Sequence, residues 1–94
     1  MFTRLFFGTI QTGKSDQAMK VLTDFATKVR KHKGCVLTQV LQSGNEVVGV
    51  TSWETQEDLA TYADSEVARS LFRNITPLFM GMPTVRSYDV KVNL

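Results

Sequence analysis

The chain has 94 residues, of which 43% are hydrophobic and 21% charged, and its formal net charge is +2. This length supports one hydrophobic core and this composition excludes a disordered chain, so we expect a single domain over residues 1–94. The weak net charge, with no aromatic-rich basic strand, predicts no nucleic-acid partner.

The first two elements are a strand and a helix. Residues 2–10 are rich in Phe, Thr, Leu and Ile, which favours a strand. A helix is expected to begin with Ser15 or Asp16 as its cap and to end before Gly34. Its last turn would carry the basic residues of 28–33, whose charges complement the carbonyl end of the helix dipole. Spacings of three and four place one apolar stripe on this helix: Ala18, Leu22, Phe25, Ala26 and Val29.

A hairpin follows the first helix. Residues 35–42 and 46–53 are apolar strand segments separated by Ser43-Gly44-Asn45, a sequence typical of a tight turn. These two strands are therefore expected to pair in antiparallel orientation.

The second half of the chain repeats the order of helix and strand. A helix is expected from Thr55 or Gln56, with a break and a new cap at 64–66, and Pro77 ends it. Residues 84–92 form the last strand. The apolar stripe of this helical segment is Leu59, Ala63, Val67 and Leu71. The order β-α-β-β-α-β is that of a ferredoxin-like α+β domain with a four-stranded antiparallel sheet.

Apolar side chains alternate onto both faces of these strands. In the first strand Phe2 and Phe6 point one way, and Leu5 and Phe7 point the other. Because the helices cover one face only, a lone subunit would expose more apolar surface than soluble monomers usually do. We therefore expect a homodimer that buries the second face and closes a β-barrel. The alternative is a monomer whose partly exposed sheet binds a hydrophobic ligand.

One segment matches a nucleotide-binding motif formally. Residues 8–15, GTIQTGKS, fit the pattern G-x-x-x-x-G-K-[ST]. P-loop enzymes build this motif on a parallel sheet and use a further carboxylate for Mg²⁺, whereas the predicted hairpin makes this sheet antiparallel. We therefore interpret the segment as a turn followed by a helix start.

Cysteine and histidine are each present once, as Cys35 and His32. One cysteine excludes an intrachain disulfide and suits a reducing compartment, and without a cluster of ligands no metal site is expected. Cys35 is expected to pack as a small apolar group, and His32 to lie in water at the end of the first helix. No signal peptide and no run of about 18 apolar residues is present, so we expect a cytoplasmic protein without a membrane partner.

Several sequence features recur together along nearly the whole chain. Gly34 precedes the second strand, Trp53 and Glu54 lead into the second helix, and Pro83-Thr84-Val85 opens the last strand. In this arrangement the chain resembles the antibiotic biosynthesis monooxygenase (ABM) family of the dimeric α/β-barrel superfamily. The resemblance implies a homodimer with a cavity between the sheet and the helices of each protomer.

The resemblance also implies a chemistry and a set of residues. Some members of that family oxidise phenolic substrates with O₂ and without metal or flavin, so no cofactor is expected. The residues of this chain that would contact a substrate are Trp53, Tyr62, Phe72 and Arg86. Arg86 and Tyr88 are then the candidate catalytic residues, as groups that stabilise an oxyanion.

A second branch of the family degrades haem, and this chain departs from it. That branch carries an Asn in the first strand, a Trp in the second helix and an axial His shortly afterwards. Here residues 2–10 contain no Asn, Tyr62 stands at the position of the Trp, and Phe72 stands near that of the His. Haem binding is therefore not expected.

Three functions stay open on the sequence alone. The first is a cofactor-independent monooxygenase-like enzyme acting on a small aromatic or quinone-like molecule. The second is a non-catalytic dimer that binds a small apolar or aromatic ligand. The third is a structural dimer whose cavity is filled by phenylalanines, namely Phe6, Phe25, Phe72 and Phe79.

Overall fold

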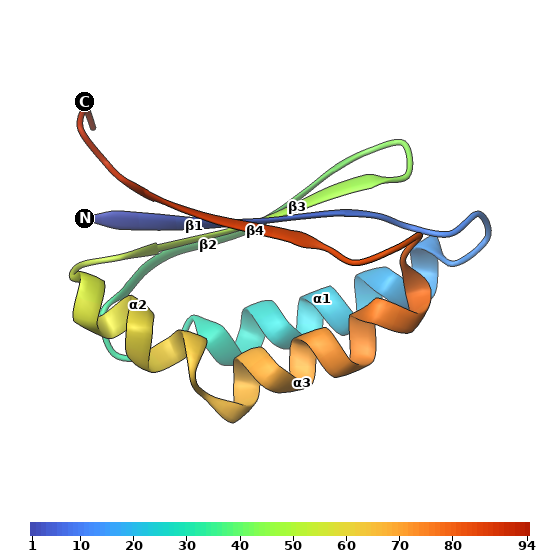
Figure 1. The fold of residues 1–94 in the computed structure, drawn as a ribbon, viewed down its shortest axis with the longest axis horizontal. Helices are drawn as coiled ribbons and strands as arrows, with labels where there is room; N and C mark the ends of the chain where they lie inside the picture. The colour runs from blue at the N-terminus through green and yellow to red at the C-terminus, as the bar shows by residue number, and fades with distance from the viewer.

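The structure, a computed structural model, describes every residue from Met1 to Leu94. Four strands form one antiparallel sheet in the order β2-β3-β1-β4, and the helices lie on a single face of it (Figure 1). The expected ferredoxin-like α+β fold is thereby confirmed. None of the helices is both long and apolar enough to cross a membrane. The elements in chain order are β1 (Phe2–Thr9), α1 (Ser15–Val29), β2 (Cys35–Ser43), β3 (Glu46–Trp53), α2 (Gln56–Ala63), α3 (Glu66–Ile75), the 3-10 helix η1 (Thr76–Leu78) and β4 (Thr84–Asp89).

Helix α1 begins differently from the sequence-based expectation. Lys14, rather than Ser15 or Asp16, is its N-cap, and no side chain caps the helix. Gly13, at φ +83°, turns the chain into the helix in a conformation that glycine adopts without strain. The Ser15 hydroxyl is used elsewhere, because it accepts a hydrogen bond from Gln42 Nε2 at 3.0 Å.

The other end of α1 also differs. The helix stops at Val29, so Lys28 is the only basic residue of its last turn, and residues 30–33 lie in the connection to β2. Gly34 follows this connection at φ +81°, and a Cβ there would meet the Asp58 carboxylate of α2. Gly34 therefore allows the start of β2 to pack closely against α2, rather than ending α1.

The helical segment after β3 is broken where the sequence predicts a break. Helix α2 ends at Ala63, and the Ser65 hydroxyl caps α3 by accepting from the Ala68 amide at 3.3 Å. The break resets the helical phase. After the break, Ala68 of α3 is therefore buried more fully than Val67. Before it, α2 buries Tyr62, three residues after Leu59, instead of Ala63.

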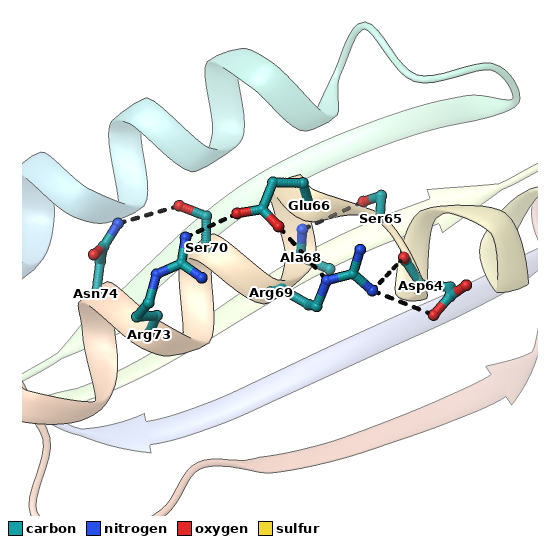
Figure 2. A network of polar contacts seen from close by, with 8 residues as sticks. All are labelled: Asp64, Ser65, Glu66, Ala68, Arg69, Ser70, Arg73 and Asn74. Atoms are coloured by element: carbon teal, nitrogen blue, oxygen red, sulfur yellow. Dashed lines mark hydrogen bonds and ion pairs between the residues drawn. The ribbon is translucent and has the colours of Figure 1, made fainter.

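Charged side chains bridge this break on the solvent side of α3 (Figure 2). Arg69 reaches back to Asp64 and donates to its main-chain carbonyl at 2.8 Å. Arg73 pairs with Glu66 at 2.8 Å, and this hydrogen bond lowers the pKa of the Glu66 carboxyl. Because these groups are exposed, each pair adds little to the free energy of unfolding.

Strand β4 is shorter than the expected 84–92 and ends at Asp89. Asp89 pairs with Phe2, the first residue of β1, so no further strand residue is available as a partner. The remaining contact is a hydrogen bond from the Val90 amide to the Met1 carbonyl at 2.9 Å.

The pairing register divides the strand side chains between two faces. Phe6 lies beside Val85 under the helices, where 14 buried apolar residues form the core. On the opposite side, here called the helix-free face, Phe7, Val48 and Leu41 are neighbours in one row across three strands. Phe7 is 37% exposed and Leu41 49% exposed. The helix-free face therefore presents apolar side chains to solvent, as the alternation along the strands predicts.

Candidate functional site

A cavity lies between the sheet and the helices, on the face that carries the core. The free space inside it is about 10 Å³, enough for about one water molecule. The rings of Phe6 and Phe72 meet edge to face in its wall, with 5.5 Å between their centroids. An aromatic ligand would therefore have to displace side chains. The lining residues are Arg4 and Phe6 of β1, Phe25 of α1, Gly49 and Thr51 of β3, Tyr62 of α2, and Leu71 and Phe72 of α3.

Two of these side chains lie between the cavity and a groove on the outer surface. Phe25 and Leu71 line the cavity and also line a groove of about 360 Å³ between α1 and α3. The two helices lie side by side along this groove (Figure 1). Movement of Phe25 or Leu71 would therefore connect the cavity with solvent.

The polar end of the cavity is organised around Tyr62. Tyr62 is 3% exposed, and its ring stacks on Trp53 with 4.8 Å between centroids and 19° between planes. Trp53 is fully buried, and its Nε1–H donates to Thr51 Oγ1 at 3.0 Å. The guanidinium carbon of Arg4 lies 5.8 Å from the centroid of the Tyr62 ring, within the range of a cation–π contact. Residues of β1, β3 and α2 therefore hold the Tyr62 ring in one orientation.

Burial also determines the protonation state of Tyr62. Desolvation raises the pKa of its phenol to about 12, against the opposing effect of the nearby Arg4 charge. The phenol therefore keeps its proton near neutral pH. In that state it can donate a hydrogen bond, but it cannot act as a general base.

This raised pKa predicts a loss of stability in alkaline solution. The unfolded chain releases the Tyr62 proton near pH 10 and the folded chain near pH 12, so unfolding is favoured as pH rises between these values. At about 1.4 kcal/mol for each pH unit, the free energy of unfolding falls by roughly 2–3 kcal/mol at pH 12. Urea unfolding of the wild type and of Tyr62→Phe at pH 9 to 12 should show this extra fall in the wild type only. An equal pH dependence in the two proteins would contradict the assignment.

Arg4 has no partner for its charge within the chain. It is half-buried, none of the five ion pairs of the structure includes it, and its side chain makes no hydrogen bond to another residue. The lining of the cavity contains no carboxylate. The positive charge at the polar end of the cavity is therefore not neutralised by this protein.

His32 and Cys35 lie beside this end of the cavity but do not line it. The His32 ring packs edge-on against Tyr62, with 5.7 Å between centroids, so His32 is not simply a solvated residue at a helix end. Cys35 Sγ lies 3.2 Å from Thr38 Oγ1. No three His, Cys, Asp or Glu side chains are close enough together to hold a metal ion.

The structure brings together some of the residues expected at the site and separates others. Tyr62 and Phe72 line the cavity, and Trp53 supports Tyr62 from behind it. Arg86 pairs with Leu5, and Tyr88 pairs with Thr3, across β4 and β1, so both belong to the helix-free face. Arg86 and Tyr88 are therefore on the opposite side of the sheet from the cavity.

Arg4 lines the cavity, although the sequence alone left open which polar strand residues face it and Arg4 was not among the residues selected for the site. In β1 Arg4 lies on the same face as Phe2 and Phe6, so a charged residue stands between two residues that face the core. Thr51, its partner in β3, likewise shares the alternation of Val47 and Trp53. A charged side chain among core-facing positions was the signal that could have identified it.

The P-loop-like residues 8–15 do not form a phosphate-binding loop. Gly8 and Thr9 belong to β1, and the Phe79 ring occupies the space that a Cβ on Gly8 would need. The missing side chain of Gly8 therefore lets the Phe79 ring pack closely against β1. This agrees with the interpretation of the segment as a turn followed by a helix start.

A comparison with protein families identifies the chain. The sequence model of the family described as Antibiotic biosynthesis monooxygenase (ABM) matches residues 1–74. The chain belongs to the ABM family. The matched segment contains every residue that lines the cavity, so the cavity lies within the family's own region of sequence. No curated protein matches this chain.

Solved structures share the ABM fold over almost their whole length. Rv0793 from Mycobacterium tuberculosis is 14% identical, covers 98% of this chain and 96% of its own, and superposes with a TM-score of 0.89. A conserved protein from Methanosarcina mazei Go1 is 15% identical, with coverages of 97% and 94% and a TM-score of 0.87. A structure named antibiotic biosynthesis monooxygenase is 16% identical, with coverages of 96% and 98% and a TM-score of 0.84. At these identities the likeness shows the fold alone.

Proposed function

We propose that this ABM protein is a cofactor-independent monooxygenase-like enzyme that acts on a small aromatic or quinone-like molecule in the cavity between sheet and helices. The observation that carries the proposal is the composition of the cavity wall. Phenylalanines surround most of the space, and the polar side chains Arg4, Thr51 and Tyr62 gather at one end. An apolar pocket with a few convergent polar groups is the usual form of a small-molecule site.

The proposed reaction needs no electrons from outside the substrate. A phenol with a free para position reacts with one O₂ to give a quinone and one water. One oxygen atom of O₂ becomes the new carbonyl, and the other leaves as water with the para ring hydrogen and the hydroxyl hydrogen of the phenol. The substrate supplies all four electrons. The protein has to bind the phenol, orient it and exclude bulk water.

Tyr62 and the phenylalanine walls supply these roles in the proposal. The neutral phenol of Tyr62 donates a hydrogen bond to the substrate oxygen, and Trp53 keeps the Tyr62 ring in place. Phe72 moves aside to admit the substrate, because the free space of about 10 Å³ does not accommodate a ring.

The proposal predicts O₂ uptake that depends on an added phenol with a free para position, with one quinone formed per O₂ and no added metal or flavin. Tyr62→Phe removes the hydrogen-bond donor and is expected to lower kcat by about tenfold to a hundredfold, somewhat less than the loss of a full oxyanion-hole donor. An oxygen electrode and quinone absorbance measure both quantities.

The matched control for that experiment is Thr61→Ala, at the exposed neighbouring position of the same helix. Thr61→Ala should leave the rate unchanged. Absence of uptake across a panel of phenols with a free para position, or equal rates in Tyr62→Phe and the wild type, would contradict the proposal.

We also propose that a second copy of the chain covers the helix-free face. The support is the row of Phe7, Val48 and Leu41, because two apolar faces are stable in water only when both are covered. A homodimer of this kind would place Arg86 and Tyr88 at or near the contact between the sheets rather than in the cavity.

The filled cavity favours a second candidate function, a non-catalytic dimer that binds a small apolar ligand or serves a structural role. Only about 10 Å³ remains free, and Phe6, Phe25 and Phe72 occupy the rest. Ligand binding without catalysis predicts that phenols raise Tm without O₂ uptake. A purely structural role predicts neither effect.

A further inference from the structure

We propose that the cavity binds its aromatic ligand in an anionic form and that Arg4 is the residue that selects the charge. The inference rests on the proposed function, because it specifies the ionisation state and the binding residue of the same ligand. It concerns binding, and so it can be tested apart from turnover.

The guanidinium of Arg4 is unpaired. Arg4 is half-buried on the core-facing side of β1, between Phe2 and Phe6, yet no carboxylate pairs with it. Withdrawing a charge from water is unfavourable unless a partner is present. The natural partner is then an anion from outside the chain, which a guanidinium can bind through two parallel hydrogen bonds.

The acidic residue nearest in the adjacent strand, Asp89, is paired elsewhere. Asp89 of β4 pairs with Phe2 of β1. Phe2 and Arg4 lie on the same face of β1, so the Asp89 carboxylate is on the same face of the sheet as Arg4. The Asp89 carboxylate pairs with Lys91 at 2.9 Å instead. The hydrogen bond from Lys91 also lowers the pKa of the Asp89 carboxyl.

The side chains around Arg4 offer ring contacts but no negative charge. The Tyr62 phenol beside it is neutral near pH 7 and adds no negative charge that would satisfy the guanidinium. Phe6, Phe25 and Phe72 lie on the other side and offer ring contacts. This combination fits a planar ligand that has an aromatic ring and one carboxylate or phenolate group. The ring would lie among the phenylalanines, and the negative charge would lie at Arg4.

Benzoate and benzamide test the inference, because they share a ring and nearly a size and differ in charge. Their dissociation constants are measured by calorimetry at pH 7 and constant ionic strength, with the full chain and with Phe72→Ala, which enlarges the cavity. We expect benzoate to bind at least about tenfold more tightly than benzamide. Arg4→Gln should abolish this preference, and Arg4→Lys should retain part of it.

The control is Arg30→Gln, which removes the same charge from an exposed position after α1, outside the cavity. It should keep the full preference for benzoate. Equal affinities for the two ligands in the wild type and in Phe72→Ala, an unchanged preference in Arg4→Gln, or no binding of either ligand would overturn the inference. The O₂-uptake experiment decides the proposed function separately, because it does not depend on benzoate.

A stability measurement separates a ligand-binding arginine from a structural one. Because Arg4 has no carboxylate partner and only the cation–π contact with Tyr62 in the free protein, Arg4→Gln should change Tm little. Benzoate should raise Tm of the wild type and not of Arg4→Gln. A marked fall of Tm in Arg4→Gln without ligand would show that the guanidinium is a structural element and would overturn the inference.

Discussion

Leu41→Lys is expected to convert the proposed dimer into monomers at micromolar concentration. Leu41 is 49% exposed in the single chain and continues the apolar row of Val48 and Phe7. Burying the exposed half of a leucine side chain at an interface contributes about 0.7–1.5 kcal/mol, half of the value for a fully exposed leucine. In a twofold dimer the change occurs twice, so the expected loss is about 1.5–3 kcal/mol, or roughly tenfold to a hundredfold in Kd, to which the cost of placing Lys against apolar side chains adds. Sedimentation velocity measures the shift in mass.

The control for this experiment is Val36→Lys in the same edge strand. Val36 is 53% exposed, but it lines a groove between α1 and β2 instead of the helix-free face. It should leave the dimer intact, whereas Phe7→Lys, in the same row as Leu41, should dissociate it. A monomeric wild type, or a dimer that survives both Leu41→Lys and Phe7→Lys, would contradict the assignment of this face.

The fold followed from the sequence because several local patterns agreed. The turn at 43–45, the caps at Thr55 and Ser65 and the alternation in the strands all point to one order of elements, and the structure has that order. The break after α2 shows the limit of such patterns. A stripe of four-residue steps continued across the break selects Ala63 and Val67, whereas the structure buries Tyr62 in α2 and Ala68 in α3. Tyr62 is the residue that the site needs.

The alternation of side chains between the two faces of the sheet places the catalytic candidates Arg86 and Tyr88 away from the cavity. Apolar or aromatic residues point to both faces of the last strand. The amino-acid composition therefore does not reveal that Val85 faces the helices and that Arg86 does not. The pairing of Phe6 with Val85 and of Leu5 with Arg86 decides it. Such pairing depends on residues about 80 positions apart in the chain, a distance over which local patterns carry no information. The sequence likewise does not say which face of the sheet Arg4 lies on, because only the structure shows which side of β1 the helices cover.

Trp53 has the structural role on which the site depends most, and Trp53→Ala is expected to lower the free energy of unfolding by about 3–5 kcal/mol. That is a large share of the roughly 5–14 kcal/mol expected for 94 residues. The side chain is fully buried, so its removal leaves a cavity beneath Tyr62 and takes away the stacking partner at 4.8 Å. It also leaves the buried Thr51 hydroxyl without the indole N–H that donates to it at 3.0 Å.

Trp53→Phe separates these contributions, because it keeps a ring under Tyr62 and removes the indole N–H. Its expected loss is about 1–3 kcal/mol, the range for an unsatisfied buried polar group. Urea unfolding followed by far-UV circular dichroism measures both variants without relying on tryptophan fluorescence. A loss below about 1 kcal/mol in Trp53→Ala would mean that Tyr62 and its neighbours close the space by themselves. In that case the orientation of Tyr62 would not depend on the stack, and the proposed supporting role of Trp53 in the site would be wrong.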